Sequence, residues 1–142
     1  MVLQCAISRS LLAVIHAHAA REAPREACGL LFGTEASIEA VTPAVNVADQ
    51  PERRFEIDPA ALFAALRAER GGGRRLIGYD HSHPSGDTTP SRADAGAAAP
   101  DGRLWLIVAG NRASLWRAET KGAVNGRFTA VELLADPGQA LQ

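Results

Sequence analysis

Short apolar runs alternate along the chain with polar segments rich in turn residues, a pattern typical of strands separated by helices and loops. The apolar runs predict strands at 1–7, 28–32, 38–47, 55–57, 76–83, 104–108, 114–117 and 128–134. Strands dominate, and the gaps between them are long enough for helices. This order predicts an α/β fold in which helices pack against a mixed β-sheet.

The first predicted helix begins at a cap on Ser8 or Ser10 and runs to about Glu22, where Pro24 ends it. Its apolar residues recur at intervals of four and predict one buried face. These residues are Leu11, Ile15 and Ala19.

Two further helices follow. Asp58-Pro59 combines an N-cap with proline at the first helical position, and Gly71 ends that helix. Its expected apolar face consists of Leu62, Phe63 and Leu66. Ser91 is a suitable N-cap for a short alanine-rich helix over 93–99.

The 142 residues fit one domain, which we expect to span 1–135, with a tail at 136–142. A net charge of −1 argues against a nucleic-acid binder, and no apolar run approaches the length of a membrane span. Cys5 and Cys28 are too few for a disulfide framework and lack CxxC spacing. A cytoplasmic protein is the simplest interpretation, because the apolar run 11–15 is too short for a signal peptide.

Two histidines at the end of a predicted strand are the first candidates for chemistry. His81 and His83 stand two residues apart, so both side chains project from the same face. With a carboxylate from the following loop they would form a three-ligand zinc site with an open fourth position. His16 and His18 have the same spacing on a predicted helix, where they point about 200° apart and cannot chelate one ion.

Three aspartates compete for the role of carboxylate ligand. Strand alternation points Asp80 away from the histidines, whereas Asp87 lies beside a glycine and is equally suited to a turn. Asp94 falls in the first turn of the helix capped by Ser91, and this helix would hold its side chain in a fixed position. Spacing favours Asp94 only modestly over Asp87.

A hydrolase of this design also needs a base that takes a proton from water. Glu26 leads the candidates because it immediately precedes the apolar strand at 28–32. Glu22, Glu35 and Glu39 are also available, and a surface carboxylate is the default interpretation of each.

Together these residues resemble the motif of the JAMM (MPN-plus) metalloproteases. Glu26-Ala27-Cys28-Gly29-Leu30-Leu31-Phe32-Gly33 is followed by His81-Ser82-His83-Pro84, then Ser91 and Asp94 at the family's offsets. The resemblance covers roughly 3–134 and is greatest to small, stand-alone bacterial members.

The resemblance implies a curved mixed β-sheet flanked by helices, related to the cytidine-deaminase architecture. It implies that His81, His83 and Asp94 hold one zinc per chain, that Glu26 is the general base and that Ser91 stabilises the oxyanion. The implied substrate is a ubiquitin-like or sulfur-carrier protein, cleaved at the peptide or isopeptide bond after its C-terminal Gly-Gly. A homodimer is compatible with this interpretation.

The chain departs from the family pattern in two places. Family members often carry Trp and then an aromatic or polar residue between the strand glycine and the first histidine, where this chain has Gly78-Tyr79-Asp80. The segment after Asp94 is also too short for the long insertions of ubiquitin-specific eukaryotic members. We expect a different groove and the same metal chemistry.

Three alternatives remain open from the sequence. A catalytically silent MPN scaffold would not need to keep all four of His81, His83, Asp94 and Glu26. A zinc deaminase would carry H-x-E followed by P-C-x-x-C, and both are missing. A hydrolase of small amides is compatible with the same residues.

Overall fold

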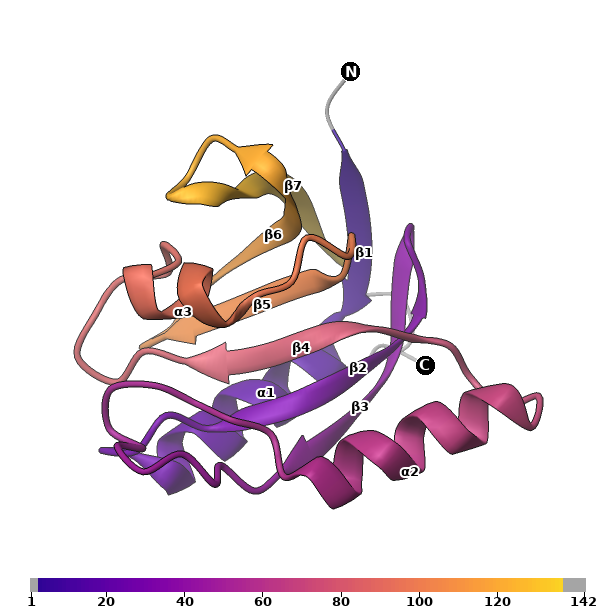
Figure 1. Cartoon of the computed structure of the whole chain (residues 1–142), viewed down its shortest axis with the longest axis horizontal. Coiled ribbons are helices and arrows are strands. Elements are labelled where there is room, and N and C mark those ends of the chain that lie inside the picture. The colour runs from indigo at the N-terminus through magenta and orange to yellow at the C-terminus, as the bar shows by residue number, and fades with distance from the viewer. Residues whose placement is uncertain (1–2, 137–142) are drawn as a thin grey trace.

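The computed structural model describes residues 3–136 as one sheet with three helices around it (Figure 1). The helices are α1 (Arg9–Glu22), α2 (Pro59–Arg70) and α3 (Arg92–Ala97). The strands are β1 (Gln4–Ser8), β2 (Cys28–Thr34), β3 (Ser37–Ala44), β4 (Leu76–Ser82), β5 (Leu104–Ala109), β6 (Arg112–Gly122) and β7 (Gly126–Asp136). Apart from Asp136, the predicted tail lies outside the described residues.

The sheet is mixed, as the sequence predicts, and it closes on itself in the order β1-β3-β2-β4-β5-β6-β7. Closure occurs through β1, which pairs in parallel with β7 and, over two residue pairs, with β3. β4 and β5 also run parallel, whereas the remaining neighbours are antiparallel. The family resemblance implies a curved sheet, but closure was not predicted, because closure depends on pairing between the two ends of the chain.

The first helix forms as predicted. Ser8 caps α1 by accepting a hydrogen bond from the N–H of Leu11, and Ala23 ends the helix one residue before Pro24. Ile15 is buried in the main core, and Leu11 and Ala19 pack against its edge. The four-residue spacing therefore identified the buried face correctly.

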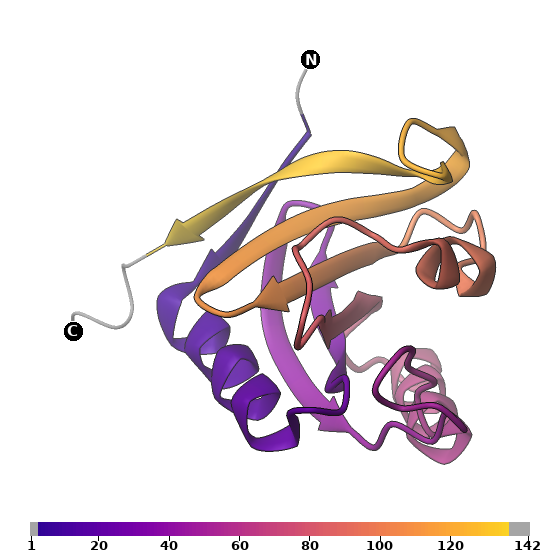
Figure 2. The same cartoon turned by 90° about the vertical axis from the view of Figure 1, so that its left-hand side faces the viewer.

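The second helix packs against the other face of the sheet (Figure 2). Asp58 caps it and Gly71 ends it, as expected. Leu62, Ala65 and Leu66 join a second core cluster that includes Cys28 and Leu76. The prediction for Phe63 is wrong: its side chain is 62% exposed, because it lies about 100° around the helix from Leu62.

Several predicted boundaries need correction. Residues 55–57 are not a strand, since only Ile57 forms an isolated bridge, to Asn46. β3 ends at Ala44, before the expected Val47, and β6 extends well beyond the expected 114–117. Within residues 3–136, none of the helices combines the length and apolarity that crossing a membrane requires.

Candidate metal centre

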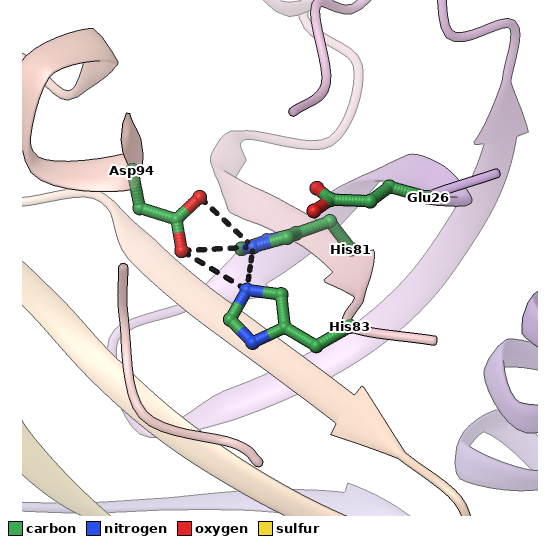
Figure 3. Close-up of side chains that lie close together, drawn as sticks. All are labelled: Glu26, His81, His83 and Asp94. Atoms are coloured by element: carbon green, nitrogen blue, oxygen red, sulfur yellow. Dashed lines mark hydrogen bonds and ion pairs between the residues drawn. The ribbon is translucent and has the colours of Figure 1, made fainter. Parts of the chain in front are cut away.

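Four buried side chains converge at one end of β4 (Figure 3). They are Glu26, His81, His83 and Asp94, and each offers a potential ligand atom that lies within 4.8 Å of the others. Glu26 precedes β2, the histidines end β4, and Asp94 lies on α3. The structure thus brings together the four residues that the motif singled out.

Hydrogen bonds of the sheet hold the histidines and Glu26 in register. The N–H of His83 donates to the carbonyl of Val108 at 2.9 Å, which continues the β4–β5 pairing past Ser82. Ser82 donates its N–H to the carbonyl of Ala27 at 3.1 Å, and its Oγ accepts the N–H of Ala27 at 2.8 Å. Ser82 therefore ties the histidine segment to the residue next to Glu26, a role that sequence reasoning did not assign.

Asp94 is fixed by a reciprocal cap at the start of α3. Its N–H donates to Oγ of Ser91 at 3.0 Å, and the N–H of Ser91 donates to Oδ2 of Asp94 at 2.9 Å. Burial alone would raise the pKa of Asp94, but hydrogen bonds from His81 and His83 outweigh it and hold that pKa well below its usual range. Asp94 is therefore a carboxylate.

Both histidines present Nε2 to the centre. Nδ1 of His83 lies 2.7 Å from the carbonyl of Asp87, so we assign a proton there. Loss of the proton on Nε2, which faces Asp94, would leave a lone pair for a metal. Burial lowers the pKa of His81, which favours the neutral ring that metal binding requires. Nδ1 of His81 is buried without a hydrogen-bond partner among the described residues.

Nε2 of His81, Nε2 of His83 and Oδ2 of Asp94 have the spacing of ligands around a single ion. Nε2 of His81 lies 3.1 Å from Nε2 of His83 and 3.2 Å from Oδ2 of Asp94. Nε2 of His83 lies 3.1 Å from Oδ2 of Asp94. Ligands about 2.0–2.1 Å from a tetrahedral zinc are about 3.3 Å apart. Two nitrogens and one carboxylate oxygen at this spacing fit a zinc ion with an open fourth position.

Glu26 differs from the other three because its carboxylate makes no hydrogen bond to them. Its N–H donates to the carbonyl of Pro51 at 2.7 Å, and its carbonyl accepts from Nδ2 of Asn46 at 2.9 Å. Oε1 is buried without a partner among the described residues. Burial raises the pKa of Glu26 to about 7, an effect that the charge of His83 opposes and that of Asp94 increases.

Aromatic rings cover the centre on the side of α2. Phe55 stacks on His81 with ring centroids 4.3 Å apart, and Trp105 meets His81 edge-on at 5.6 Å. Sequence reasoning assigned Phe55 only to a strand, since the residue reaches His81 through a loop 26 positions earlier in the chain.

The other candidates lie outside the cluster. Asp87 contributes its carbonyl to His83, and its carboxylate accepts the N–H of Thr89, as expected of a turn residue. Asp80 is buried beside Gly29, and His16 and His18 lie on α1. Among the other glutamates, Glu22 ends α1, whereas Glu35 and Glu39 are exposed.

Comparisons with known proteins agree with the family resemblance seen in the sequence. A family model described as prokaryotic homologs of the JAB domain matches residues 8–120. The chain is 35% identical over 129 residues to a desampylase from Haloferax volcanii, covering 89% of this chain and 83% of that protein. It is 41% identical over 88 residues to a probable TtuB-protein conjugate cleaving protease from Thermus thermophilus, covering 62% of this chain and 59% of that protein. A CysO-cysteine peptidase from Mycobacterium tuberculosis is 32% identical over 104 residues, covering 71% of this chain and 70% of that protein.

Solved structures share the fold. A protein from Desulfitobacterium hafniense superposes with a TM-score of 0.80 at 24% identity, covering 94% of each chain. A JAB1/MPN domain protein from Archaeoglobus fulgidus gives a TM-score of 0.56 at 18% identity, covering 93% of this chain and 98% of that one. A structure described as a JAMM metalloprotease-like zinc site gives 0.54 at 20% identity, covering 94% of this chain and 99% of that one. The predicted α/β fold, a curved mixed sheet flanked by helices, is therefore confirmed.

Proposed function

The chain belongs to the family of prokaryotic homologs of the JAB domain, and we propose that it is a zinc-dependent peptidase or isopeptidase. Its substrate would be a cytoplasmic ubiquitin-like or sulfur-carrier protein, hydrolysed at the bond after the C-terminal Gly-Gly. Relatives named for action on such conjugates support this substrate class. The observation that carries the proposal is the convergence of Glu26, His81, His83 and Asp94 in one buried cluster.

His81, His83 and Asp94 would hold the zinc, one ion per chain. When bound, zinc lowers the pKa of a coordinated water to about 7 and polarises a scissile carbonyl. All three ligand candidates come from the same chain, so the centre does not require a second copy. The homodimer that the sequence allows remains a prediction.

Glu26 would move the proton. Its carboxylate offers an oxygen within 4.8 Å of the ligand atoms, and among the described residues Oε1 has no hydrogen-bond partner that would have to be displaced first. A carboxyl group with a pKa near the working pH can accept a proton from the attacking water and deliver it to the leaving amine.

Ser91 would stabilise the oxyanion. Its Oγ already accepts the N–H of Asp94, so its own hydroxyl proton is free to donate to a developing negative charge. The same contact caps α3, so Ser91 combines a structural role with the proposed chemical one.

An extended tail has a suitable approach beside Phe55. A groove of about 360 Å³ lies between Phe55 and the small residues of α3, and it includes Asp94. A neighbouring apolar hollow of about 260 Å³ continues past Tyr79 and Trp105. Gly96 and Ala97 bring only small side chains to the wall near Asp94, so the backbone of a Gly-Gly tail can approach this wall closely.

The backbone along this groove can pair with the tail. Glu56 exchanges hydrogen bonds with Asn46 and Val47, whereas Phe55 and Ile57 on either side have no backbone hydrogen bond to other described residues. Phe55 and Ile57, alternate residues of one extended segment, thus have backbone N–H and C=O groups that are unpaired among the described residues. An incoming peptide can add as a strand at such an edge.

The proposal is tested by incubating the zinc-loaded chain with ubiquitin-like carrier proteins whose Gly-Gly tail is extended by one residue or joined to a lysine. Mass spectrometry should detect release after Gly-Gly. The Glu26→Gln variant should keep its zinc and lose at least about 10²-fold in turnover. Zinc-loaded wild type that releases nothing would favour a silent scaffold, and cleavage of small amides alone would favour the small-amide hydrolase.

A further inference from the structure

The side-chain amide of Asn46 connects Glu26 with the loop that lines the groove beside Phe55. Its Nδ2 donates to the carbonyl of Glu26 at 2.9 Å and to the carbonyl of Arg54 at 3.0 Å. Its Oδ1 accepts the N–H of Glu56 at 3.1 Å. We propose that Asn46 is a positioning residue, which holds Glu26 at the metal centre and also holds the segment to which the tail would pair. The proposal rests on the peptidase function proposed above.

Glu26 depends on this loop for its position, because it lies outside the sheet. β2 begins two residues later, at Cys28. Among the described residues, the N–H of Glu26 donates only to the carbonyl of Pro51, at 2.7 Å, and its carbonyl accepts only from Asn46. Oε1 has no hydrogen-bond partner there, although the carboxylate points into the cluster (Figure 3). The position of the carboxylate therefore follows from how the loop holds the backbone of Glu26.

Asn46 also fixes the backbone on both sides of Phe55. Arg54 and Glu56, the residues before and after Phe55, each share one hydrogen bond with the amide. The ring of Phe55 stacks on His81 and lines the groove proposed for the tail. One amide would therefore hold both the group that moves the proton and the edge at which the tail adds as a strand.

The donor half of the amide distinguishes this role from that of an ordinary turn residue. Oδ1 accepts the N–H of Ala48 at 3.0 Å, a contact two residues along the chain that an aspartate makes equally well. Nδ2 instead faces three carbonyls, since that of Pro51 lies at 3.4 Å in addition to those of Glu26 and Arg54. An aspartate would turn an oxygen without a proton towards these carbonyls, so the turn would remain and the hold on Glu26 would be lost.

The test compares variants of Asn46 in the zinc-loaded chain, with a carrier protein whose Gly-Gly tail is extended by one residue as substrate. Asn46→Asp keeps the acceptor and loses the donor, whereas Asn46→Ala loses both without adding charge. Because a displacement of about 1 Å can cost about 10²-fold in rate, we expect both variants to lower kcat by about 10-fold or more and to raise KM. Zinc content should not change, since the hydrogen bonds of Asn46 do not involve His81, His83 or Asp94. Thermal melts establish that each variant is folded at the assay temperature.

Gln4→Glu is the matched control, because it makes the same change from amide to acid on β1, where Gln4 donates to Glu132. It should leave kcat and KM unchanged.

A double variant separates positioning from a general loss of stability. If Asn46 acts on kcat through Glu26, Asn46→Ala should lower kcat no further in the Glu26→Gln background, whereas the rise in KM should persist. Multiplicative losses in kcat would overturn the positioning role, and so would Asn46 variants that melt earlier but keep the kcat and KM of wild type. In both cases the peptidase function stands. Wild type that releases nothing would overturn the peptidase function and this inference with it.

Discussion

The ring of Phe55 lies stacked on the imidazole of His81, with centroids 4.3 Å apart and planes inclined by 26°. Phe55 also meets Trp105 at 5.3 Å, so the ring of His81 is enclosed by two aromatic neighbours. The same Phe55 lines the groove proposed for the Gly-Gly tail. One side chain therefore connects the orientation of a proposed metal ligand with the proposed substrate path.

Phe55→Ala should weaken zinc binding. Groups that orient a metal-bound histidine typically contribute 10- to 100-fold to affinity, and we expect a loss of about 10-fold here. Competition with a chelator measures the affinity directly. Phe63→Ala is the matched control because Phe63 is mostly exposed on α2, and it should bind zinc as wild type does. Equal affinities for Phe55→Ala and wild type would show that the stack does not orient His81.

Substitutions of Ser91 separate its two roles. Ser91→Ala should lower kcat by about 10²-fold or more through loss of an oxyanion donor, and it should destabilise the fold by about 1 kcal/mol through loss of the cap. Ser91→Gly removes the same hydroxyl, but glycine at an N-cap costs only a few tenths of a kcal/mol. Kinetics and thermal melts should therefore show both variants equally slow and only Ser91→Ala clearly less stable. A Ser91→Gly enzyme with wild-type kcat would exclude the oxyanion role.

Asp80 should make the stability of the protein depend on pH. The side chain is 4% exposed and reaches Gly29, where a Cβ would lie 2.5 Å from Oδ2. Burial raises the pKa of Asp80 from 3.8 to about 7. Because the folded state holds this proton more tightly than the unfolded state, the contribution of Asp80 to stability is fully present below about pH 4. It is lost as the pH rises through 7.

Asp80→Asn should remove this dependence, since the amide has the same shape and does not ionise. At pH 8 the variant should be more stable than wild type by a few kcal/mol at most, and the difference should shrink towards pH 5. Thermal melts of both proteins across this range measure it, and the other titrating groups cancel in the difference. A constant difference between pH 5 and pH 8 would mean that Asp80 does not titrate in this window.

The parts of the site that depend on local structure, such as strand alternation and helix capping, could be predicted from the sequence. Two histidines at i and i+2 on a strand must share a face, and Ser91 followed by Asp94 is a capping pattern that any short helix can use. The choice between Asp94 and Asp87 was different. Both lie close to His83 in sequence. Spacing favoured Asp94 only modestly and the family pattern decided the choice, because the path of residues 84–90 is not set by local preference.

Long-range packing decides what the sequence did not reveal. The closing of the sheet depends on β1 meeting β7, which lies more than 120 residues later. The alternation of Phe55 and Ile57 is a strand pattern, yet a single bridge to Asn46 leaves this segment a loop edge. Phe63 looked like a core residue because three apolar positions in five suggest one face, but the sheet contacts the side of Leu62 and Ala65.

The loop between β4 and α3 is tied down from β6. The carbonyl of Thr88 accepts hydrogen bonds from Nε1 of Trp116, at 3.1 Å, and from Oγ of Ser114. Asp87, the neighbour of Thr88, is the residue whose carbonyl accepts Nδ1–H of His83 at 2.7 Å. The two β6 side chains therefore hold in place the backbone group that orients His83, a proposed metal ligand.

Removing these two donors should weaken zinc binding without unfolding the protein. Trp116→Phe keeps the ring and loses Nε1–H, and Ser114→Ala loses the hydroxyl. Each alone leaves one donor on Thr88, so we expect a small effect from either and a loss of about 10-fold in zinc affinity from the pair. Chelator competition gives the affinities, and melts of the zinc-free proteins report any general loss of stability. If the double variant binds zinc as wild type does, the carbonyl of Asp87 is positioned by the loop itself and β6 only supports it.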